Sequence, residues 1–514
     1  MELRQVSPTI IRIPSELITE FLKDSLTYED KKVTYEWLKW HKVQKQDDQW
    51  LLNPKGRSRF WFVAKNSRFD LDEKVRLLDG QRFKSLLFQD THGYYTYSGL
   101  ASMLTKATGL PVVRTYELPS WGKVEWWEEP SYSARWYQSK SVDLLAPLDG
   151  SRSHGAVELA TGLGKSYAMA LLLKRIGLPA VVMAPTLSIA NQLLADFRKW
   201  FGREKVGQFF DSKKQSNKFF VVAVDASLTK VKKGDKHYEN IANKKVMVQD
   251  ESHICPAKTL AELSVNLLKN VPYRYFYSGT QLRSDGLGLL LDAIIGDVVL
   301  EMDVKQGVEE GHICGYKAFM WNCKSKCEIY TDDPMKATRL HLRYNQDIND
   351  HAVKLAKYAV GKGWRVLILI SEIEQFQYLM KAKILDVGVG FAHGGGLTKD
   401  QKEWIPQQYH KSETMDVVSD FDAGKFPVLV ATAVCQMGTD IKSVNCIINL
   451  FGLTSEVQIR QGVIGRGTRK SPGKTHFVIN DYCVTNVEKL LTHAKKRIKI
   501  YNSVYGKVQM KEVE

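Results

Sequence analysis

Short apolar runs alternate with amphipathic stretches from about residue 131 onward, and each run ends in a small or polar loop. Runs rich in β-branched residues and separated by helical patterns are typical of strands buried on both faces of a parallel sheet. The runs form two groups, at 156–279 and 365–451, so we expect two α/β domains joined near 305–335, where no buried-strand pattern occurs. The predicted strands are AVELA (156–160), AVVMAP (180–185), FFVVAV (219–224), KVMVQD (245–250), RYFYSG (274–279), RVLILI (365–370), PVLVAT (427–432) and CIINLF (446–451).

The first 130 residues differ in composition and are rich in Trp, Tyr and Phe. They contain the run NPKGRSRFWFVAKNSRF, which has no acidic residue. Its cations suit the phosphates of a nucleic acid, whereas its aromatic side chains either stack on bases or pack in a core on alternate strand positions. The alternation favours the core for Phe60 and Phe62. The candidate phosphate contacts are Lys55, Arg57, Arg59, Lys65 and Arg68.

The last 30 residues, 485–514, predict a basic amphipathic helix. Its apolar stripe at i, i+3, i+4, i+7 spacing favours packing against the second α/β domain over direct contact with DNA. The stripe comprises Val487, Leu490, Leu491, Ala494, Ile498 and Tyr501, and the cations expected on the other faces are Lys489, Lys495, Lys496, Arg497 and Lys499.

Composition excludes several classes of protein. The 514 residues are 44% hydrophobic and 11% aromatic, which excludes a disordered chain. No apolar run approaches the roughly 18–20 residues that cross a bilayer, and the N-terminus lacks a signal-peptide pattern, so we expect a cytoplasmic protein. The net charge of +16 fits either a polyanionic partner or plain solubility. Of the seven cysteines, only Cys323 and Cys327 are close, and their spacing favours reduced thiols over a zinc site.

The first strand of the first group runs into ELATGLGKS, a glycine-rich loop ending in Gly-Lys-Ser. Backbone N–H groups of such a loop surround phosphate oxygens, the lysine adds a positive charge at the β- and γ-phosphates, and the serine hydroxyl is placed to ligate Mg²⁺. Leu159 replaces the first glycine of the usual pattern. The residues expected to bind the nucleotide here are Thr161, Gly162, Gly164, Lys165 and Ser166.

A second buried strand ends in Asp-Glu-Ser-His. We expect Asp250 to hold Mg²⁺ and Glu251 to orient and deprotonate the attacking water. Two adjacent acids could also belong to a solvated loop, but a buried strand before them and a phosphate loop upstream favour catalysis.

Together these segments resemble the superfamily 2 helicases and translocases with a DExH-type motif II. RWYQ (135–138) resembles the Q-motif of that family. The resemblance implies that Gln138 reads the adenine edge and that Tyr137 or Arg135 braces the base.

Three more segments of the first domain follow the order of the family. APTLSIANQ resembles motif Ia, which implies nucleic-acid contacts by Pro185 and Thr186. VDASL is a weaker counterpart of motif Ib or Ic, because Asp225 stands where a threonine or a small residue is expected. SGT resembles motif III, and the resemblance implies that Ser278 and Thr280 couple hydrolysis to the nucleic-acid groove.

The second group of strands carries the remaining motifs. LISEIEQ (369–375) resembles motif IV, and ATAVCQMGTDIKSV resembles motif V. The resemblance implies that Thr432 faces the nucleic acid and that Gly438 and Asp440 lie near the nucleotide.

IRQGVIGRGTRK (459–470) resembles motif VI. The resemblance implies that Arg466 and Arg469 reach the γ-phosphate from the other motor domain as arginine fingers. The glutamine of the family is displaced by one position, to Gln461.

Residues 51–115 and the C-terminal helix resemble the UvsW-like branch-migration helicases of phages, which are related in activity to RecG-like enzymes. This resemblance implies two RecA-like parallel-sheet motor domains, a small α+β N-terminal DNA-binding domain and a C-terminal helix. It also implies an ATP- and Mg²⁺-dependent helicase, acting as a monomer on branched or forked DNA, in the cytoplasm of a bacterial host if the gene is phage-encoded. The expected boundaries are 1–130, 131–310, 311–484 and 485–514.

Three alternatives remain open from the sequence. A restriction-type translocase of double-stranded DNA can carry the same motif VI, although we find no nuclease-like set of carboxylates. The motor motifs alone also fit an RNA helicase. A DNA-binding scaffold without catalysis is disfavoured because every residue type needed for hydrolysis is present together.

Overall fold

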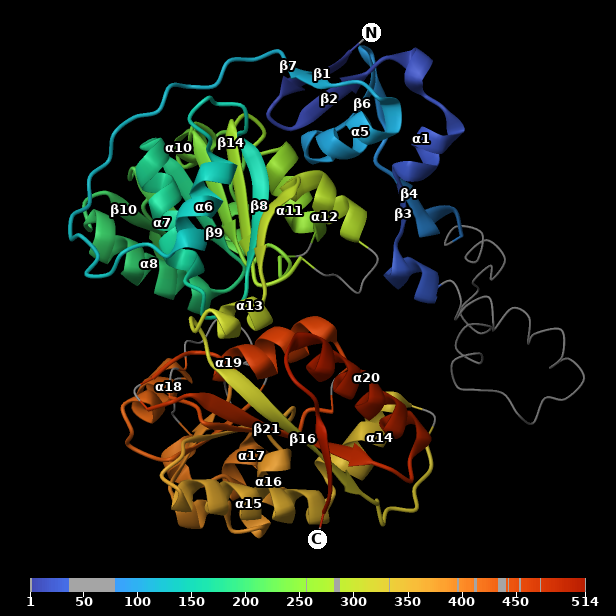
Figure 1. The fold of residues 1–514 in the computed structure, drawn as a ribbon, viewed down its shortest axis with the longest axis vertical. Helices are drawn as coiled ribbons and strands as arrows, with labels where there is room; N and C mark the ends of the chain where they lie inside the picture. The colour runs from blue at the N-terminus through green and yellow to red at the C-terminus, as the bar shows by residue number, and fades with distance from the viewer. Residues whose placement is uncertain are drawn as a thin grey trace, which may run out of the picture. The chain divides into compact units, whose positions relative to one another are not determined.

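The computed structural model divides the chain into two compact units (Figure 1). The first comprises Met1–Val157 and Ala168–Leu300, and the second comprises Glu158–Tyr167 and Glu301–Glu514. The residues that the structure describes are 2–36, 79–255, 257–281, 287–331, 333–394, 397–410, 414–432, 441, 443–452, 454–471 and 473–513.

An eight-stranded sheet forms the framework of the first motor domain, in the order β11-β10-β12-β9-β13-β14-β8-β15. All five strands predicted from the first group of apolar runs are confirmed. The patterns of the other three were too short or too polar to stand out. The strands are β8 (His154–Leu159), β9 (Ala180–Ala184), β10 (Val206–Phe210), β11 (Lys213–Lys214), β12 (Phe220–Val224), β13 (Val246–Asp250), β14 (Tyr273–Ser278) and β15 (Val298–Met302).

Helices cover both faces of this sheet, with α6, α7 and α8 on one side and α11 and α12 on the other (Figure 1). Strands β10, β12, β9, β13 and β14 are mutually parallel. Their carboxyl ends therefore lie at one edge of the sheet, where a doubly wound fold binds its ligands. The helices are α6 (Trp136–Leu145), α7 (Lys165–Ile176), α8 (Leu187–Phe201), α9 (Asp225–Leu228), α10 (Tyr238–Ala242), α11 (Ala257–Val265) and α12 (Gly288–Ile295).

The N-terminal region forms a small α+β structure, as the fold class predicts. Its five-stranded sheet has the order β5-β6-β2-β1-β7, and a two-stranded sheet pairs β3 with β4. Short helices, α1 and α5 among them, complete the described part of this region. The elements are β1 (Leu3–Ser7), β2 (Ile10–Ile13), α1 (Glu20–Ser25), β3 (Thr27–Glu29), β4 (Phe83–Ser85), β5 (Phe88–Asp90), β6 (Gly93–Tyr97), α5 (Ala101–Thr108) and β7 (Val112–Arg114).

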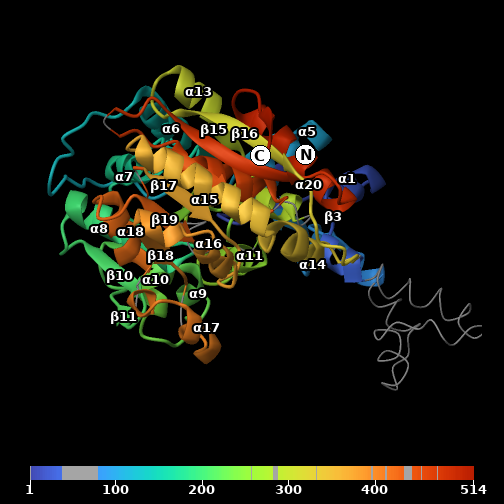
Figure 2. The same ribbon diagram turned by 90° about the horizontal axis from the view of Figure 1, so that it is seen from below.

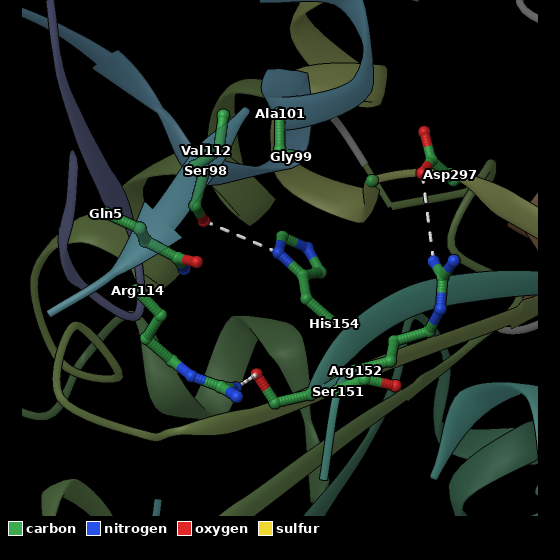
Figure 3. A pocket seen from close by; sticks show the side chains of 12 residues that line it. Gln5, Ser98, Gly99, Ala101, Val112, Arg114, Ser151, Arg152, His154 and Asp297 are labelled. Carbon is green, nitrogen blue, oxygen red and sulfur yellow. Dashed lines mark hydrogen bonds and ion pairs between the residues drawn. The ribbon is translucent and has the colours of Figure 1, made fainter. Parts of the chain in front are cut away.

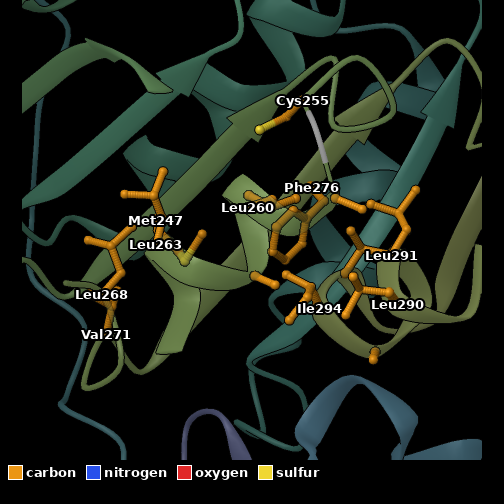
Figure 4. Packing of buried hydrophobic residues seen from close by; sticks show 14 of the residues in the cluster. Met247, Cys255, Leu260, Leu263, Leu268, Val271, Phe276, Leu290, Leu291 and Ile294 are labelled. Atoms are coloured by element: carbon orange, nitrogen blue, oxygen red, sulfur yellow. The ribbon is translucent and has the colours of Figure 1, made fainter. Parts of the chain in front are cut away.

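One hydrophobic core joins the N-terminal region to the first motor domain. Leu3 and Leu104 belong to the same buried cluster as Phe276 and Leu291, and Figure 4 shows the motor side of that cluster. The Gly99 backbone abuts the carbonyl of Ala293 in α12, so closely that no Cβ would fit there. The N-terminal region is therefore built onto this motor domain rather than tethered to it.

Polar contacts cross the same junction around a cavity of about 590 Å³ (Figure 3). Ser102 donates to Asp297 over 2.5 Å, and Arg152 lies 3.7 Å from the same carboxylate. His154 faces the carbonyl of Ile294 at 2.7 Å, and its burial lowers the pKa of its imidazole to about 3. The imidazole is therefore neutral at physiological pH and acts as a packing group of the junction.

Tryptophans in the connection to the first motor domain pack against that domain. The Trp126 ring lies 5.0 Å from that of Phe201. Trp121 donates its indole N–H to the Tyr273 hydroxyl at 3.0 Å. This connection is thus fastened along the surface of the motor domain.

The second motor domain contains a seven-stranded sheet, in the order β18-β19-β17-β20-β21-β16-β22, and every neighbouring pair is parallel. The three strands predicted from the second group of runs are confirmed. Separate buried clusters line its two faces. The strands are β16 (Gly315–Cys323), β17 (Val366–Leu369), β18 (Val389–Ala392), β19 (Val428–Ala431), β20 (Cys446–Asn449), β21 (His476–Val484) and β22 (Gln509–Glu512).

The expectation that 305–335 lacks a buried strand is wrong, because β16 crosses this segment beside β21. Exposed Lys317 and half-buried Asn322 interrupt its apolar positions, so the strand does not read as a continuous run. Figure 2 shows β16 and the helices of this domain from below. They are α13 (Val304–Glu309), α14 (Pro334–Thr338), α15 (Gln346–Gly361), α16 (Gln375–Lys381), α17 (Lys399–Trp404), α18 (Thr414–Asp422), α19 (Gly465–Gly467) and α20 (Glu488–Val504).

The C-terminal helix packs on the second motor domain, but it ends at Val504, and the chain then returns to the sheet as β22 beside β16. The prediction that Arg497 lies on an exposed face is wrong. Its side chain is buried and donates two hydrogen bonds to Asp481, of 3.0 and 3.1 Å. Tyr501 and Asn449 donate to the same carboxylate, so a fully paired buried charge fixes α20 to the sheet.

No helix in the described ranges is long and apolar enough to cross a membrane. Six of the cysteines lie in these ranges, and all six are free thiols.

We expect Arg497→Met to lower the free energy of unfolding of the second motor domain by about 3–5 kcal/mol, because it leaves the Asp481 carboxylate buried without its cation. Urea unfolding of the full chain measures this loss. Lys496→Met, which changes an exposed neighbour on the same helix, is the matched control and should change stability by about 0.5 kcal/mol or less. A loss below about 1 kcal/mol for Arg497→Met would contradict the role assigned to the buried pair.

Candidate functional site

The glycine-rich loop lies between β8 and α7, so its backbone faces the N-terminus of a 12-residue helix. Gly162 and Gly164 have φ angles of +94° and +78°, in the left-handed region that favours glycine. Backbone N–H groups at such a turn and helix start form an anion-binding concavity. Thr161, Lys165 and Ser166 therefore flank a loop whose conformation suits a chain of phosphates.

The acidic motif follows β13 at the carboxyl edge of the sheet. Asp250 is the last residue of that strand, is 5% exposed and accepts a hydrogen bond from the Glu251 N–H at 2.9 Å. Glu251 has a φ of +46°, which non-glycine residues rarely adopt. The backbone thus turns sharply where the sequence predicts the catalytic carboxylate.

Asp225, the residue that departs from the motif Ib pattern, lies against the acidic motif. The Gln249 amide donates to the Asp225 carboxylate at 3.3 Å and to the Asp250 carbonyl at 3.0 Å. Burial raises the pKa of Asp225 to about 6. Asp225 therefore links the end of β12 to β13, the strand that carries motif II. The sequence showed only that an aspartate stands where the family has a threonine or a small residue, and it did not indicate this contact.

The histidine of the acidic motif contacts motif III. His253 Nδ1 lies 2.5 Å from the Ser278 hydroxyl and 3.5 Å from a Glu251 carboxylate oxygen. The Ser278 hydroxyl also contacts the backbone of Thr280. Motif II and motif III are thus connected through one imidazole, an arrangement consistent with the predicted coupling role of Ser278 and Thr280.

The Q-motif begins α6. The Gln138 side chain is 4% exposed, and its oxygen accepts the Arg135 N–H at 3.0 Å as part of a capping box. The Tyr137 ring is buried, and its hydroxyl accepts from the Arg135 guanidinium at 2.8 Å. A buried ring cannot stack on a base without leaving the core. Trp136, which is 54% exposed, is the aromatic side chain of this segment that lies at the surface.

Several predicted nucleic-acid contacts can be located. Thr186 follows β9 and caps α8, accepting the Ile189 N–H at 3.4 Å, and Pro185 precedes it at the same edge of the sheet. Thr432 follows β19 and is only 6% exposed. Seven other predicted site residues lie outside the described residues: Lys55, Arg57, Arg59, Lys65, Arg68, Gly438 and Asp440.

Motif VI lies against the glycine-rich loop within the second compact unit. The Thr468 hydroxyl is 3.0 Å from the Thr161 carbonyl oxygen, and a Cβ added to Gly162 would lie 3.6 Å from Arg469 Cγ. The Arg466 side chain is 6% exposed. The segment with both predicted arginine fingers thus contacts the predicted phosphate loop.

A lysine that the sequence did not single out braces motif VI. Lys474 Nζ donates to the carbonyl oxygens of Gly467 and Arg469, at 2.6 and 2.9 Å, and lies 5.5 Å from the centre of the Phe477 ring. It is 7% exposed, and burial lowers its pKa to about 8. The sequence did not indicate this role. Both acceptors are backbone carbonyls, on either side of Thr468, and any residue type carries such a carbonyl.

Two family descriptions match this chain. "Type III restriction enzyme, res subunit" matches residues 131–278, and "Helicase conserved C-terminal domain" matches residues 347–471. The first contains the glycine-rich loop and the acidic motif, and the second contains motif VI.

The chain belongs to the superfamily 2 helicases. It is an ATP-hydrolysing nucleic-acid helicase with two RecA-like motor domains. Helicase 22 of the Sulfolobus islandicus filamentous virus is 20% identical over 492 residues, which cover 90% of this chain and 84% of that protein.

Solved helicase structures are also similar to this chain. Dbp5 of S. cerevisiae, bound to RNA, is 17% identical with a TM-score of 0.51, covering 73% of this chain and 88% of that one. This likeness shows the fold alone. T4 UvsW is 16% identical, covering 100% of this chain and 99% of that one, with a TM-score of 0.39.

We expect Lys474→Met to lower kcat for ATP hydrolysis about 10- to 100-fold with little change in KM for ATP, because small displacements of charge-stabilising groups are costly in the transition state. Steady-state ATPase assays measure both constants. Lys470→Met, at an exposed neighbour, serves as the control and should keep the activity. A normal kcat in Lys474→Met, or an equal loss in both variants, would refute the bracing role.

Proposed function

We propose that this helicase is an ATP-driven DNA translocase that remodels branched DNA. The observation that carries the ATPase part is the contact of motif VI with the glycine-rich loop, through Thr468 and Thr161. It supports a site in which Lys165 neutralises the β- and γ-phosphates while Arg466 and Arg469 stabilise the charge that develops on the transferred phosphoryl group. Arginine fingers contribute about 10³–10⁵ in rate, so hydrolysis depends on keeping this loop in place.

The acidic motif supports Mg²⁺ as the metal ion and Glu251 as the general base. Mg²⁺ prefers oxygen ligands, and the Ser166 hydroxyl and the Asp250 carboxylate are of that kind. Glu251 is the general base for the attacking water. The contact from its motif through His253 to Ser278 supports coupling of hydrolysis to the nucleic-acid loops.

DNA as the track is supported by the family description of residues 131–278, which is that of a restriction enzyme subunit. The branched character of the substrate rests on the resemblance of residues 51–115 to UvsW-like helicases and on the basic–aromatic run within that segment. A restriction-type translocase of linear duplex DNA is the second candidate, because the same description favours it.

Substrate preference tests the proposed function. We expect ATP hydrolysis to be stimulated more by forked and four-way DNA than by linear duplex or single-stranded RNA, with strand exchange on four-way DNA measured by gel electrophoresis. Equal stimulation by linear duplex would favour the restriction-type translocase. Equal stimulation by RNA would contradict the assignment to DNA.

We expect Glu251→Gln to bind ATP normally but to lose about 10²–10⁴-fold in turnover, because it removes the base and keeps the shape of the side chain. Fluorescent-nucleotide binding and ATPase assays separate the two effects. Lys165→Ala is the companion variant and should lose DNA-dependent hydrolysis. Full activity in Lys165→Ala, or lost ATP binding in Glu251→Gln, would show that these roles are misassigned.

We expect glutamine at the five N-terminal cations to weaken binding of branched DNA in a salt-sensitive way while sparing ATPase stimulated by single-stranded DNA. Substitution is preferable to deleting residues 1–115, because Leu3 and Leu104 contribute to the core of the motor domain. Unchanged affinity for four-way DNA would refute the role of the segment. The five positions are Lys55, Arg57, Arg59, Lys65 and Arg68.

A further inference from the structure

A cluster of exposed lysines lies at the outer edge of the first motor domain and belongs to none of the helicase motifs described above. It is formed by two segments, 211–214 and 229–237, which together contain six lysines against two aspartates, an excess of four positive charges. We call this cluster the edge lysines. They are Lys213, Lys214, Lys230, Lys232, Lys233 and Lys236, and all six are exposed.

The two segments are held together by side chains between them. The Ser216 hydroxyl, just after β11, lies 2.8 Å from His237 Nδ1 and accepts a hydrogen bond from Asn240 at 3.1 Å. The His237 ring also meets the Phe209 ring edge-on, with centroids 5.4 Å apart. The cluster is therefore part of a packed surface rather than a pair of unrelated loops.

The ammonium groups of Lys214 and Lys230 are close enough to interact. Partial burial and the nearby Lys230 ammonium lower the pKa of Lys214, while Asp211 opposes them. Lys214 Nζ lies 4.8 Å from the centre of the Phe209 ring, which restrains its position. Holding like charges together on a surface costs free energy, and a bound polyanion would recover that cost.

The position of the edge lysines at the carboxyl edge of the sheet favours a nucleic acid as that polyanion. Strands β13, β9, β12 and β10 are neighbours and parallel, and the turn into β11 follows the carboxyl end of β10. Asp250, Thr186 and α9 lie at the carboxyl ends of β13, β9 and β12 in that order, and the edge lysines lie further out along the same edge of the sheet. Thr186 and α9 belong to the predicted nucleic-acid motifs.

The spacing between strands gives the distance from Thr186 to the edge lysines, and hence the number of phosphates between them. From β9 to β11 there are three strand spacings of about 4.8 Å, roughly 14 Å in all. One strand of a duplex advances about 3.4 Å per phosphate, so the edge lysines lie about four phosphates beyond Thr186.

We infer that the edge lysines bind the phosphate backbone of duplex DNA that extends beyond the motor's own track. The contact is to phosphates, so it adds affinity without sequence preference. It would hold the arm of the substrate next to the first motor domain. This inference rests on the proposed function, since it takes the same DNA as its ligand.

The test is a quadruple variant, Lys213→Gln, Lys214→Gln, Lys230→Gln and Lys233→Gln. In the part of the chain that the structure describes, none of these four side chains donates a hydrogen bond. Its affinity for a forked DNA with a long duplex arm, measured by fluorescence anisotropy at about 0.1 M salt, should fall about 10-fold or more. The slope of log K against log salt should become shallower by about 0.9 for each lost phosphate contact. ATPase stimulated by a short single strand should not change.

Two controls make the result specific. Arginine at the same four positions should retain the affinity, because it retains the charge. Glutamine at four exposed lysines of the second motor domain, Lys362, Lys381, Lys383 and Lys402, should leave the affinity for the long arm unchanged.

The outcomes distinguish this inference from the proposed function. An unchanged affinity and salt slope in the quadruple variant, with a wild-type protein that binds and hydrolyses normally, would overturn the inference alone. An equal loss in the control variant would overturn it too, since the effect would then be one of net charge. A wild-type protein with no DNA-stimulated hydrolysis would refute the proposed function itself.

Discussion

The parallel register of the first sheet is the constraint on which the candidate site depends. Because β9, β12, β13 and β14 run in one direction, their carboxyl ends lie at a single edge. Thr186, Asp225, Asp250 and Ser278 each stand at or just past one of those ends. Reversing any of these strands would move its polar residue to the opposite edge, away from the others. The chemistry is therefore assembled by topology, and local contacts such as that between His253 and Ser278 refine it.

Two buried charges in the second motor domain, Arg497 and Lys474, are tolerated because each has several partners. Arg497 meets both oxygens of Asp481 and the carbonyl of Tyr482. Lys474 is paired with backbone carbonyls around Thr468 rather than with a carboxylate. A charge held by carbonyl oxygens restrains the chain segment that carries them, and here that segment is the one with both predicted arginine fingers.

The sequence predicted the strands that contain a short apolar run, and it missed strands whose polar residues interrupt that pattern or are buried by contacts with other segments. Eight strands were predictable because each contains a short, mostly apolar run between loops or helical patterns. Strand β16 was not predictable, since Lys317 and Asn322 interrupt its apolar positions. Strand β21 was not, since it carries Asn480 and Asp481, which are buried only because other segments supply their partners.

The same reason limits the prediction of the site. The glycine-rich loop and the Asp250–Glu251 pair are recognisable from neighbouring residues alone, and their backbone conformations agree with the expectation. The inward turn of Arg497 and the burial of Tyr137 depend on partners in other segments or on the depth of a core, and the bracing by Lys474 depends on the backbone conformation of motif VI. Amphipathic spacing gives no information about either.

The common core of the N-terminal sheet and the first motor domain has a consequence for how this protein can evolve. Leu3, Leu104 and Leu291 belong to one apolar cluster, so the two parts melt and form as one cooperative block. A module of this kind cannot be exchanged between related enzymes like a domain on a flexible linker. A chimaera that joins the N-terminal region to another motor needs a matching α12 surface, and the N-terminal region and the first motor domain therefore tend to be inherited together.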